Sequence, residues 1–108
     1  MQHKISLSGA IDTLKQEKDF PFAVLMKHGT MSVEYFAPEN ADTRQPHQQD
    51  EIYVIASGKS IFFCGGQYMD CKQGDFLFVP AGMEHRFENL SDDFATWVIF
   101  YGAEGGEK

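Results

Sequence analysis

The stretch that decides the fold is Gly74-Asp75-Phe76-Leu77-Phe78-Val79-Pro80-Ala81-Gly82-Met83-Glu84-His85-Arg86-Phe87-Glu88-Asn89. Two short runs in it, Phe76–Val79 and His85–Glu88, carry the aromatic and β-branched residues that favour strands. Between them stands Pro80-Ala81-Gly82, a combination typical of a tight turn. Proline suits the end of a strand, where its missing N–H is not needed. The stretch therefore predicts two short strands joined by a turn.

The same pattern extends in both directions along the chain. Turn signals such as Ser57-Gly58, Gly65-Gly66 and Ser91-Asp92-Asp93 separate the apolar runs. Many short strands at this pitch predict a sandwich or a barrel. Before them, Ser8–Asp19 has helical spacing, with Ser8 as the expected N-cap. The further strands are expected at Phe22–Met26, Met31–Ala37, Ile52–Ala56, Ser60–Cys64 and Phe94–Tyr101.

Composition narrows the class of partner. The 108 residues carry a net charge of −7, which argues against nucleic acid because a phosphate backbone needs a positive surface; the charge otherwise serves solubility. No apolar run has the length of a membrane span, and charge interrupts the N-terminal stretch too soon for a secretion signal. We therefore expect a cytoplasmic protein. A two-residue turn at Gly65-Gly66 would place Cys64 opposite Gln67 and away from Cys71, so both thiols are expected to be reduced.

Two segments concentrate the residue types that bind metals, one containing His47 and Glu51 and the other ending at His85. His47 and Glu51 share one parity, so both would face the same side of a strand. Four extended residues span about 13 Å, near the limit of what the two side chains can bridge. If both bind one ion, the chain must bend through Gln48-Gln49-Asp50.

His85 lies far along the chain, but a closed barrel turns alternate residues of all its strands into one interior. Together with His47 and Glu51 it would form a two-histidine, one-carboxylate set that leaves coordination positions open. With a divalent ion, such a site keeps positive charge and suits a small anionic or chelating molecule. The alternative is that His47 and Glu51 are simply a surface pair.

The spacing of these residues resembles that of the cupin superfamily. Gly74, Pro80, Gly82, His85 and Asn89 match its second motif, which runs Gly, five residues, Pro, one residue, Gly, two residues, His, three residues, Asn. The first motif ends with His, three or four residues, Glu, six residues, Gly. It is matched by His47, Glu51 and Gly58. The chain is similar to small single-domain bacterial cupins.

The resemblance implies an all-β, double-stranded β-helix or jelly-roll cupin barrel over residues 38–102. Residues 1–37 would pack on it as a short helix and strands, and 103–108 would form a flexible tail, all within one domain. It also implies a divalent transition metal (Fe, Mn, Ni or Zn) held by His47, Glu51 and His85, a small anionic ligand and a homodimer. The family pattern has a histidine where this chain has Gln45, which leaves the fourth ligand open between Gln45 and water.

Around these ligands, six side chains are candidates for the pocket wall, with plain core packing as the alternative. Tyr53 is also the candidate catalytic group, because an inward hydroxyl could move a proton. His3 and His28 are expected to be exposed. Three classes of function remain: a metal-dependent enzyme (an oxygenase, isomerase, lyase or decarboxylase), a small-ligand binding or sensing module, and a structural dimer without activity. The pocket candidates are Gln49, Tyr53, Phe78, Met83, Phe87 and Trp97.

Overall fold

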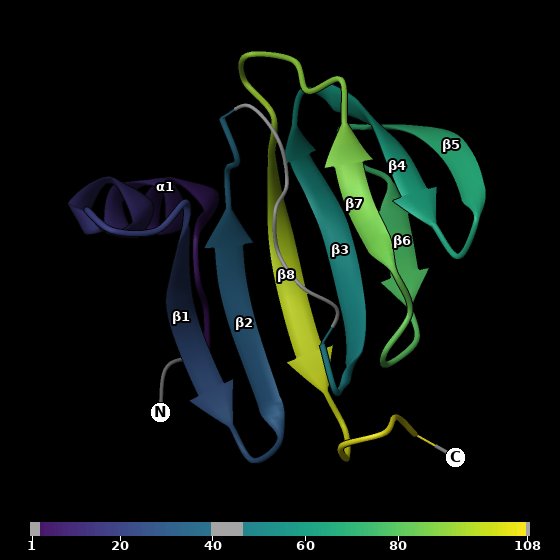
Figure 1. The fold of residues 1–108 in the computed structure, drawn as a ribbon. Coiled ribbons are helices and arrows are strands. Elements are labelled where there is room, and N and C mark those ends of the chain that lie inside the picture. Colours follow the sequence, from purple (N-terminus) through teal and green to yellow (C-terminus); the bar gives the residue numbers. More distant parts are fainter. Residues whose placement is uncertain (1–2, 40–46, 108) are drawn as a thin grey trace.

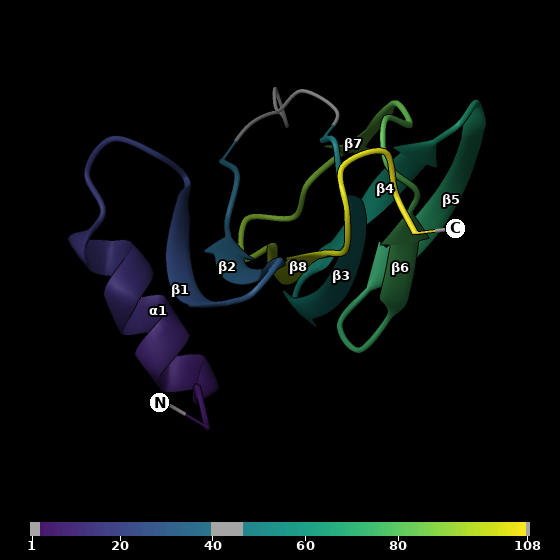
Figure 2. The same ribbon diagram turned by 90° about the horizontal axis from the view of Figure 1, so that it is seen from below.

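A computed structural model describes residues 3–39 and 47–107. Two antiparallel sheets face each other in it, one with strand order β1-β2-β8-β3-β6 and the other with order β5-β4-β7 (Figures 1 and 2). This arrangement confirms the predicted all-β jelly roll with a short N-terminal helix. The elements in this part of the chain are α1 (Leu7–Gln16), β1 (Phe22–His28), β2 (Met31–Phe36), β3 (Asp50–Ser57), β4 (Lys59–Cys64), β5 (Gln67–Lys72), β6 (Phe76–Val79), β7 (His85–Glu88) and β8 (Ala95–Tyr101).

The helix begins and ends earlier than its spacing predicted. Ser6, and not Ser8, is the N-cap: its Oγ accepts the Gly9 N–H at 3.0 Å. Ser8 lies within the first turn instead, and α1 ends at Gln16 rather than Asp19. Serine caps a helix by accepting an N–H three positions later, and both serines offered that geometry in sequence.

Strand β5 was not among the strands expected from apolar runs, although the predicted hairpin at Gly65-Gly66 requires a partner strand after the turn. It is an edge strand, and of its side chains only Cys71 is buried. Without one buried face, it has no alternation of polar and apolar residues to reveal it. The predicted hairpin register is nevertheless confirmed, since Cys64 faces Gln67. Both cysteines are free, as expected.

The space between the sheets is filled by side chains from both of them. Tyr53 and Phe87 meet edge to face with ring centroids 4.9 Å apart, and Phe87 also contacts Phe62 and Phe94. Alternate residues of each strand enter this core, as the period of two requires. Its buried members are Phe36, Tyr53, Ile55, Phe62, Cys71, Val79, Phe87, Phe94, Val98 and Phe100.

A second apolar cluster lies on the outer face of the five-stranded sheet, beneath α1. Ala10 of the helix is fully buried there against Tyr35 and Ala95, with Trp97 packed beside them. Strand β2 also pairs with β8, so the N-terminal strands continue the same sheet. The helix thus covers one end of that face.

The glycines of the predicted turn signals lie in turns. At Gly58 the φ angle is 76°, and an added Cβ would come within 2.8 Å of the Phe94 Cα. Gly74 and Gly82 also have positive φ angles, 93° and 78°. Asn89 has a φ of 52°, a conformation that asparagine tolerates in turns better than most residues. These positions need backbone conformations that ordinary side chains seldom adopt.

The C-terminal segment, expected to be a flexible tail, makes hydrogen bonds to the start of β3 and the residues before it. The Gly105 N–H donates to the Gln48 carbonyl at 2.7 Å, and the Glu107 N–H donates to Asp50 Oδ2 at 2.9 Å. Asp50 is buried, and its Oδ1 accepts the Ala81 N–H. One carboxylate therefore joins the tail to the turn before β7.

No helix among the described residues is long and apolar enough to span a membrane.

Candidate functional site

Strand β3 carries an ionisable side chain into the core. Glu51, Tyr53 and Ile55 alternate toward the inner side, and each is at most 2% exposed. The strand lies between β6 and β8, where Glu51 is opposite Val79 and Phe100. A carboxylate in such a position is costly unless it is paired or coordinates a cation.

His85 is the partner that the fold brings to Glu51. It is the first residue of β7 and follows the turn at Pro80-Ala81-Gly82. Its Nε2 lies 3.1 Å from Glu51 Oε1 and 3.1 Å from the Tyr53 hydroxyl, while Nδ1 lies 2.8 Å from the Met83 carbonyl oxygen. Two of the predicted ligands and the predicted catalytic group therefore form one buried cluster, called here the Glu51–Tyr53–His85 cluster.

The proton positions in this cluster follow from its hydrogen bonds. A carbonyl oxygen only accepts, so the short contact with Met83 places a proton on His85 Nδ1. In a neutral imidazole, Nε2 then has only a lone pair, which the Tyr53 hydroxyl can satisfy as donor. Glu51 Oε1 directs a second lone pair at the same nitrogen. A proton or a cation between these two atoms removes that conflict.

The second carboxylate oxygen of Glu51 gives further evidence for a bound proton or cation. Glu51 Oε2 is buried and has no hydrogen-bond partner among the residues the structure describes. A carboxylate oxygen in this state loses its hydration without compensation. A carboxylate and an imidazole nitrogen are both ordinary ligands of divalent transition metals. The donor chemistry of the cluster therefore fits a metal ion.

His47 lies at the same end of the barrel. Its ring packs against Phe100, with centroids 4.3 Å apart, and Phe100 is the cross-strand partner of Glu51. Its carbonyl oxygen accepts the Gly82 N–H at 2.8 Å, which ties it to the turn before His85. Between His47 and Glu51, the chain bends at Gln48 and Gln49 before β3 begins, as the strand length required.

Three ligands are not gathered in one place, however. Within residues 3–39 and 47–107, no three His, Cys, Asp or Glu side chains come close enough together to hold one ion. Glu51 and His85 form a close pair, and His47 contacts two residues beside that pair, Phe100 and Gly82. Gln45 lies outside the described residues.

Three of the predicted pocket residues have other positions. Phe78 is 49% exposed, because its neighbours Leu77 and Val79 are the ones that face the core. Trp97 packs against Tyr35 on the helix side of the sheet, with ring centroids 5.6 Å apart. The Gln49 amide donates to the carbonyls of Thr30 and Gly102 and so joins two loops. Phe78 and Trp97 alternate with residues that face the core, so both side chains lie on the outer side of the sheet and not in the pocket.

The other pocket candidates lie nearer the cluster. Phe87 packs against Tyr53 in the core, while Met83 is 36% exposed, at the turn before His85. His3 and His28 are exposed, as expected.

The sequence analysis did not select Cys64, which lies opposite His85 and has its sulfur 3.5 Å from that of Met83. Burial, and then the negative charge of Glu51, raise the pKa of the Cys64 thiol. No local signal could have revealed it, because β4 and β7 are distant in sequence and only their pairing brings Cys64 to His85.

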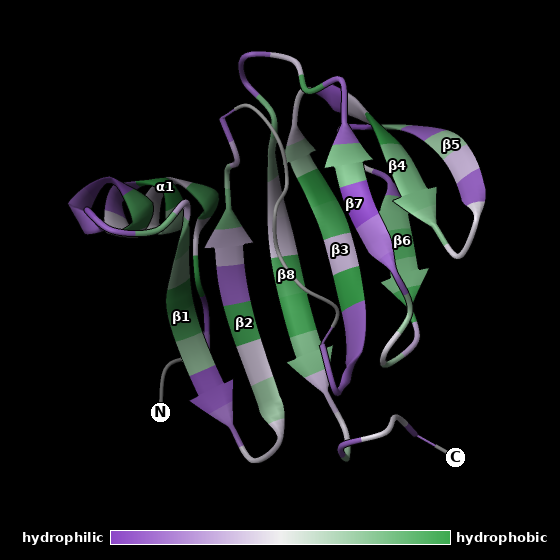
Figure 3. Cartoon of the chain, viewed as in Figure 1, coloured by the Kyte–Doolittle hydropathy of each residue, from purple (hydrophilic) through white to green (hydrophobic). Residues whose placement is uncertain are grey.

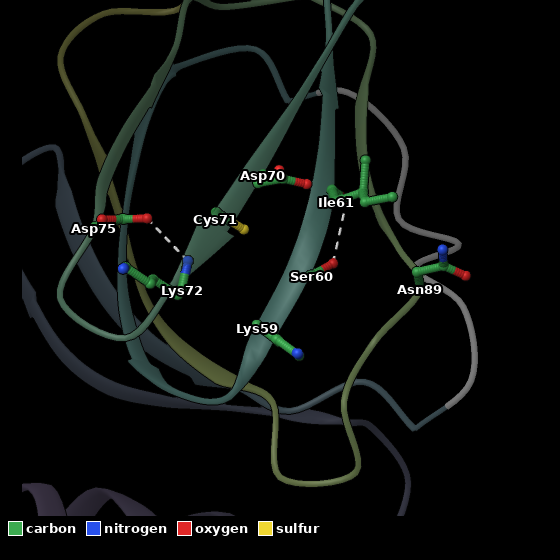
Figure 4. Close-up of a pocket in the computed structure, with 8 residues that line it drawn as sticks. All are labelled: Lys59, Ser60, Ile61, Asp70, Cys71, Lys72, Asp75 and Asn89. Carbon is green, nitrogen blue, oxygen red and sulfur yellow. Dashed lines mark hydrogen bonds between the residues drawn. The ribbon is translucent and has the colours of Figure 1, made fainter.

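A pocket of about 590 Å³ lies at the opposite end of the three-stranded sheet (Figure 4). Lys59 and Lys72 face each other across β4 and β5 there, with Asp70 and Asp75 on the same rim. Asp75 accepts the backbone N–H of Lys72. Burial, and then nearby aspartates, raise the pKa of Cys71 to about 11, so its thiol is protonated at neutral pH. The two lysines and two aspartates balance each other in charge, and the Cys71 thiol is not activated.

The fold and the cluster define a small jelly-roll barrel with ionisable groups in its interior. The family described as the cupin domain matches residues 32–101, well over half of the chain. The chain therefore belongs to the cupin family.

Relatives and solved structures agree with this assignment. The chain is 30% identical over 95 residues to an uncharacterized protein of Streptomyces coelicolor, covering 83% of this chain and 90% of that protein. It is 31% identical over 103 residues to an acireductone dioxygenase of Acidiphilium cryptum, covering 91% of this chain but only 51% of that enzyme. A cupin 2 conserved barrel domain protein of Salinispora arenicola superposes with a TM-score of 0.70 at 18% identity, covering 95% and 90% of the two chains.

Proposed function

We propose that this protein is a metal-binding cupin that acts as an enzyme on a small anionic molecule. The observation that carries the proposal is the Glu51–Tyr53–His85 cluster, in which Glu51 Oε2 is buried without a described partner and Oε1 faces an imidazole nitrogen at 3.1 Å. The 31% identity to a protein named as a dioxygenase supports an enzymatic reading.

The ligands in this proposal are Glu51 Oε1 or Oε2, His85 Nε2 and an imidazole nitrogen of His47. A divalent ion such as Fe, Mn, Ni or Zn, bound there, would supply Lewis acidity or activate dioxygen. Since Glu51 brings one negative charge, a divalent ion would leave the site positive, which favours a carboxylate, enolate or oxo acid as ligand. Gln45 or water would complete the coordination.

The chain's own residues have defined tasks around that site. The Met83 carbonyl holds the proton of His85 on Nδ1, so the lone pair of Nε2 is the one that would coordinate the ion. The Tyr53 hydroxyl, 3.1 Å from Nε2, can release that contact and donate to or accept from a bound substrate. The packed rings of Phe62 and Phe87 exclude water from the inner side of the cluster.

Metal analysis of protein purified without chelators or a nickel column tests the proposal. Wild type should carry near-stoichiometric metal, and a His47→Ala, His85→Ala variant should lose it. Removal of a direct ligand should weaken affinity by more than the roughly 10–100-fold typical of an outer hydrogen-bond partner. His28→Ala is the matched control, since His28 is exposed at the end of β1, an edge strand of the five-stranded sheet. Equal, sub-stoichiometric metal in wild type and double variant would disprove the site.

A second measurement separates an enzyme from a binding module. The metal-loaded protein, reconstituted anaerobically with Fe(II) and then exposed to oxygen, should consume a small oxo acid or enediol. A Tyr53→Phe variant should retain metal and ligand binding but turn over more slowly. Saturable binding of such acids with no turnover under any metal would support the non-catalytic alternative.

A further inference from the structure

The bend between His47 and Glu51 is bonded to the C-terminal end of the chain. Three consecutive residues of the bend, 48–50, each form a hydrogen bond to the segment 102–107, which we call the C-terminal strap. Figure 1 shows the strap at the same end of the barrel as the start of β3. The bend is thus held by a segment distant in sequence. The bonds join the Gly105 N–H to the Gln48 carbonyl oxygen (2.7 Å), the Gln49 amide to the Gly102 carbonyl oxygen (2.9 Å) and the Glu107 N–H to Asp50 Oδ2 (2.9 Å).

Asp50 also reaches the turn that precedes His85. Its Oδ1 accepts the Ala81 N–H at 2.9 Å, and Ala81 is the middle residue of that turn. The next residue, Gly82, donates its N–H to the His47 carbonyl oxygen at 2.8 Å. The segments that carry His47 and His85 are therefore bonded to each other directly, and Asp50 bonds the turn to the strap.

Asp50 and Glu51 are neighbouring buried carboxylates with different partners. Asp50 is 5% exposed, and each of its oxygens accepts one backbone N–H. Glu51 is 1% exposed, and its Oε2 has no hydrogen-bond partner among the described residues. Figure 3 shows the start of β3 as hydrophilic and the rest of the strand as mainly hydrophobic. Because hydrogen bonds compensate the burial of a carboxylate, Asp50 has a role within the fold, while Glu51 remains available to an ion.

A glycine allows the strap to lie against Asp50. Gly106 is buried and has a φ of 92°. An added Cβ would lie 2.9 Å from Asp50 Oδ1 and 3.4 Å from the Ala81 Cβ. The positive φ and the close approach both disfavour any other residue at this position. The strap therefore lies against the carboxylate and the turn at the same point.

We propose that Asp50 is a positioning residue of the metal site, and that the C-terminal strap acts through it on the segments that carry His47 and His85. The inference rests on the metal binding proposed above. Without these bonds, the bend and the turn would have to become ordered when the ion binds, and the lost conformational freedom would weaken binding. With the bonds in place, that order is already part of the fold. Groups that orient metal ligands in this way change metal affinity roughly 10–100-fold.

Metal titration of variants of the full chain tests the inference, with Zn(II) or Co(II) alone as the probe. Competition with a chromophoric chelator gives the affinity, and the visible spectrum of bound Co(II) reports the ligand geometry. Asp50→Ala should weaken binding roughly 10–100-fold and change the Co(II) spectrum. Asp50→Asn, which retains one carbonyl acceptor, should show a smaller loss. Asp12→Ala is the matched control, because it removes the same charge from an exposed position of α1.

Gly106→Val is a second way to separate the strap from Asp50. It displaces the strap and leaves the carboxylate in place, so it should weaken metal binding in the same direction as Asp50→Ala. Circular dichroism and thermal unfolding without metal identify the variants that are folded at the temperature of the titration. Should Asp50→Ala not fold, Asp50→Asn and Gly106→Val provide the test.

Lower affinity and altered Co(II) spectra in the folded Asp50 and Gly106 variants, with Asp12→Ala unchanged, support the inference. Wild-type affinity and spectrum in these variants would overturn it even if they unfold at a lower temperature, because Asp50 would then serve stability alone; the proposed metal site would still stand. An equal loss in Asp12→Ala would also overturn it, by showing that the effect follows net charge. A wild type that binds neither ion would overturn this inference and the proposed function together.

Discussion

The two faces of strand β3 reverse the usual distribution of polarity in a barrel. Toward the core, β3 presents Glu51, a carboxylate that is 1% exposed, beside Tyr53 and His85. Toward the outside it presents Ile52 and Val54, partly exposed and continuous with Phe78. In an ordinary antiparallel sheet with one solvent-exposed face, the inward side chains are apolar and the outward ones are polar.

This difference shows that neither face of β3 is explained by folding alone. A buried carboxylate lowers stability unless a cation or proton compensates it, and an exposed apolar row invites association. The inner face therefore fits the cation proposed above, while Ile52 and Val54 on the outer face stay partly exposed. The inner face also holds the core, so the two faces should respond differently to the same substitution.

The largest difference should appear when one isoleucine is truncated on each face. Ile55→Ala, on the inner face at 2% exposure, should lower the free energy of unfolding by about 2–5 kcal/mol. Ile52→Ala, on the outer face, should cost about 1 kcal/mol or less in the monomer, because its side chain is already partly in water. Urea denaturation at one low protein concentration measures both. Equal losses would mean that the outer face is packed against something within the chain.

The next largest effect concerns the buried carboxylate. Glu51→Gln removes the buried charge and offers an N–H to His85 Nε2, so the metal-free protein should unfold with a free energy unchanged or about 1–2 kcal/mol higher. The same variant should lose any rise in melting temperature that metal produces in wild type. Thermal unfolding with and without a chelator measures both effects. A loss of more than about 2 kcal/mol in the metal-free state would show instead that the Glu51 carboxylate is well compensated in the fold.

A smaller effect is expected at Tyr53. Tyr53→Phe keeps the ring packed against Phe87 and removes only the hydroxyl beside His85. The loss should be about 0.5–1.5 kcal/mol, the net contribution of one buried hydrogen bond. Urea denaturation measures it, with Phe62→Leu as a core control that keeps the hydrogen bond. No loss at all would show that the hydroxyl does not stabilise His85 in the metal-free protein.

The smallest effect is a difference in thiol reactivity between Cys64 and Cys71. Burial and nearby aspartates raise the pKa of Cys71 to about 11, so at pH 8 only about one molecule in a thousand is a thiolate. Cys64 is less buried, and its pKa is also raised. Iodoacetamide at pH 8 should therefore label Cys64 first, as peptide mass spectrometry can show. Faster labelling of Cys71 would mean that β5 opens readily from the barrel.

Much of the fold could be predicted because it depends on local patterns. The strands β6 and β7 match their predicted bounds, since Pro80 and Gly82 define both of their inner ends. Glu51, Tyr53 and His85 could also be selected, from residue type and motif spacing. By contrast, β5 was missing from the expected strands because an exposed edge strand has no alternation of polar and apolar residues. The predicted bounds of α1 were too late in the chain because Ser6 and Ser8 both suit an N-cap.

The assignment of side chains to faces needed the three-dimensional arrangement. Phe78 and Trp97 are aromatic residues close in sequence to the site, yet both point to the outer side of the sheet. The proximity of Cys64 to His85 depends on the pairing of β4 with β7, which joins residues distant in sequence. Such pairings follow from long-range packing and leave no mark on either segment alone.

By itself, the sequence determined the jelly-roll class, the free thiols and the residue types available for a metal, because turn residues and strand periodicity act over a few positions. Only the tertiary structure decided that His85 Nε2 meets both Glu51 and Tyr53, and that two rows of apolar side chains align across β6, β3, β8 and β2. The physical reason is strand register. A shift of one residue turns every side chain to the opposite face, so chemistry that needs two strands depends on how they pair.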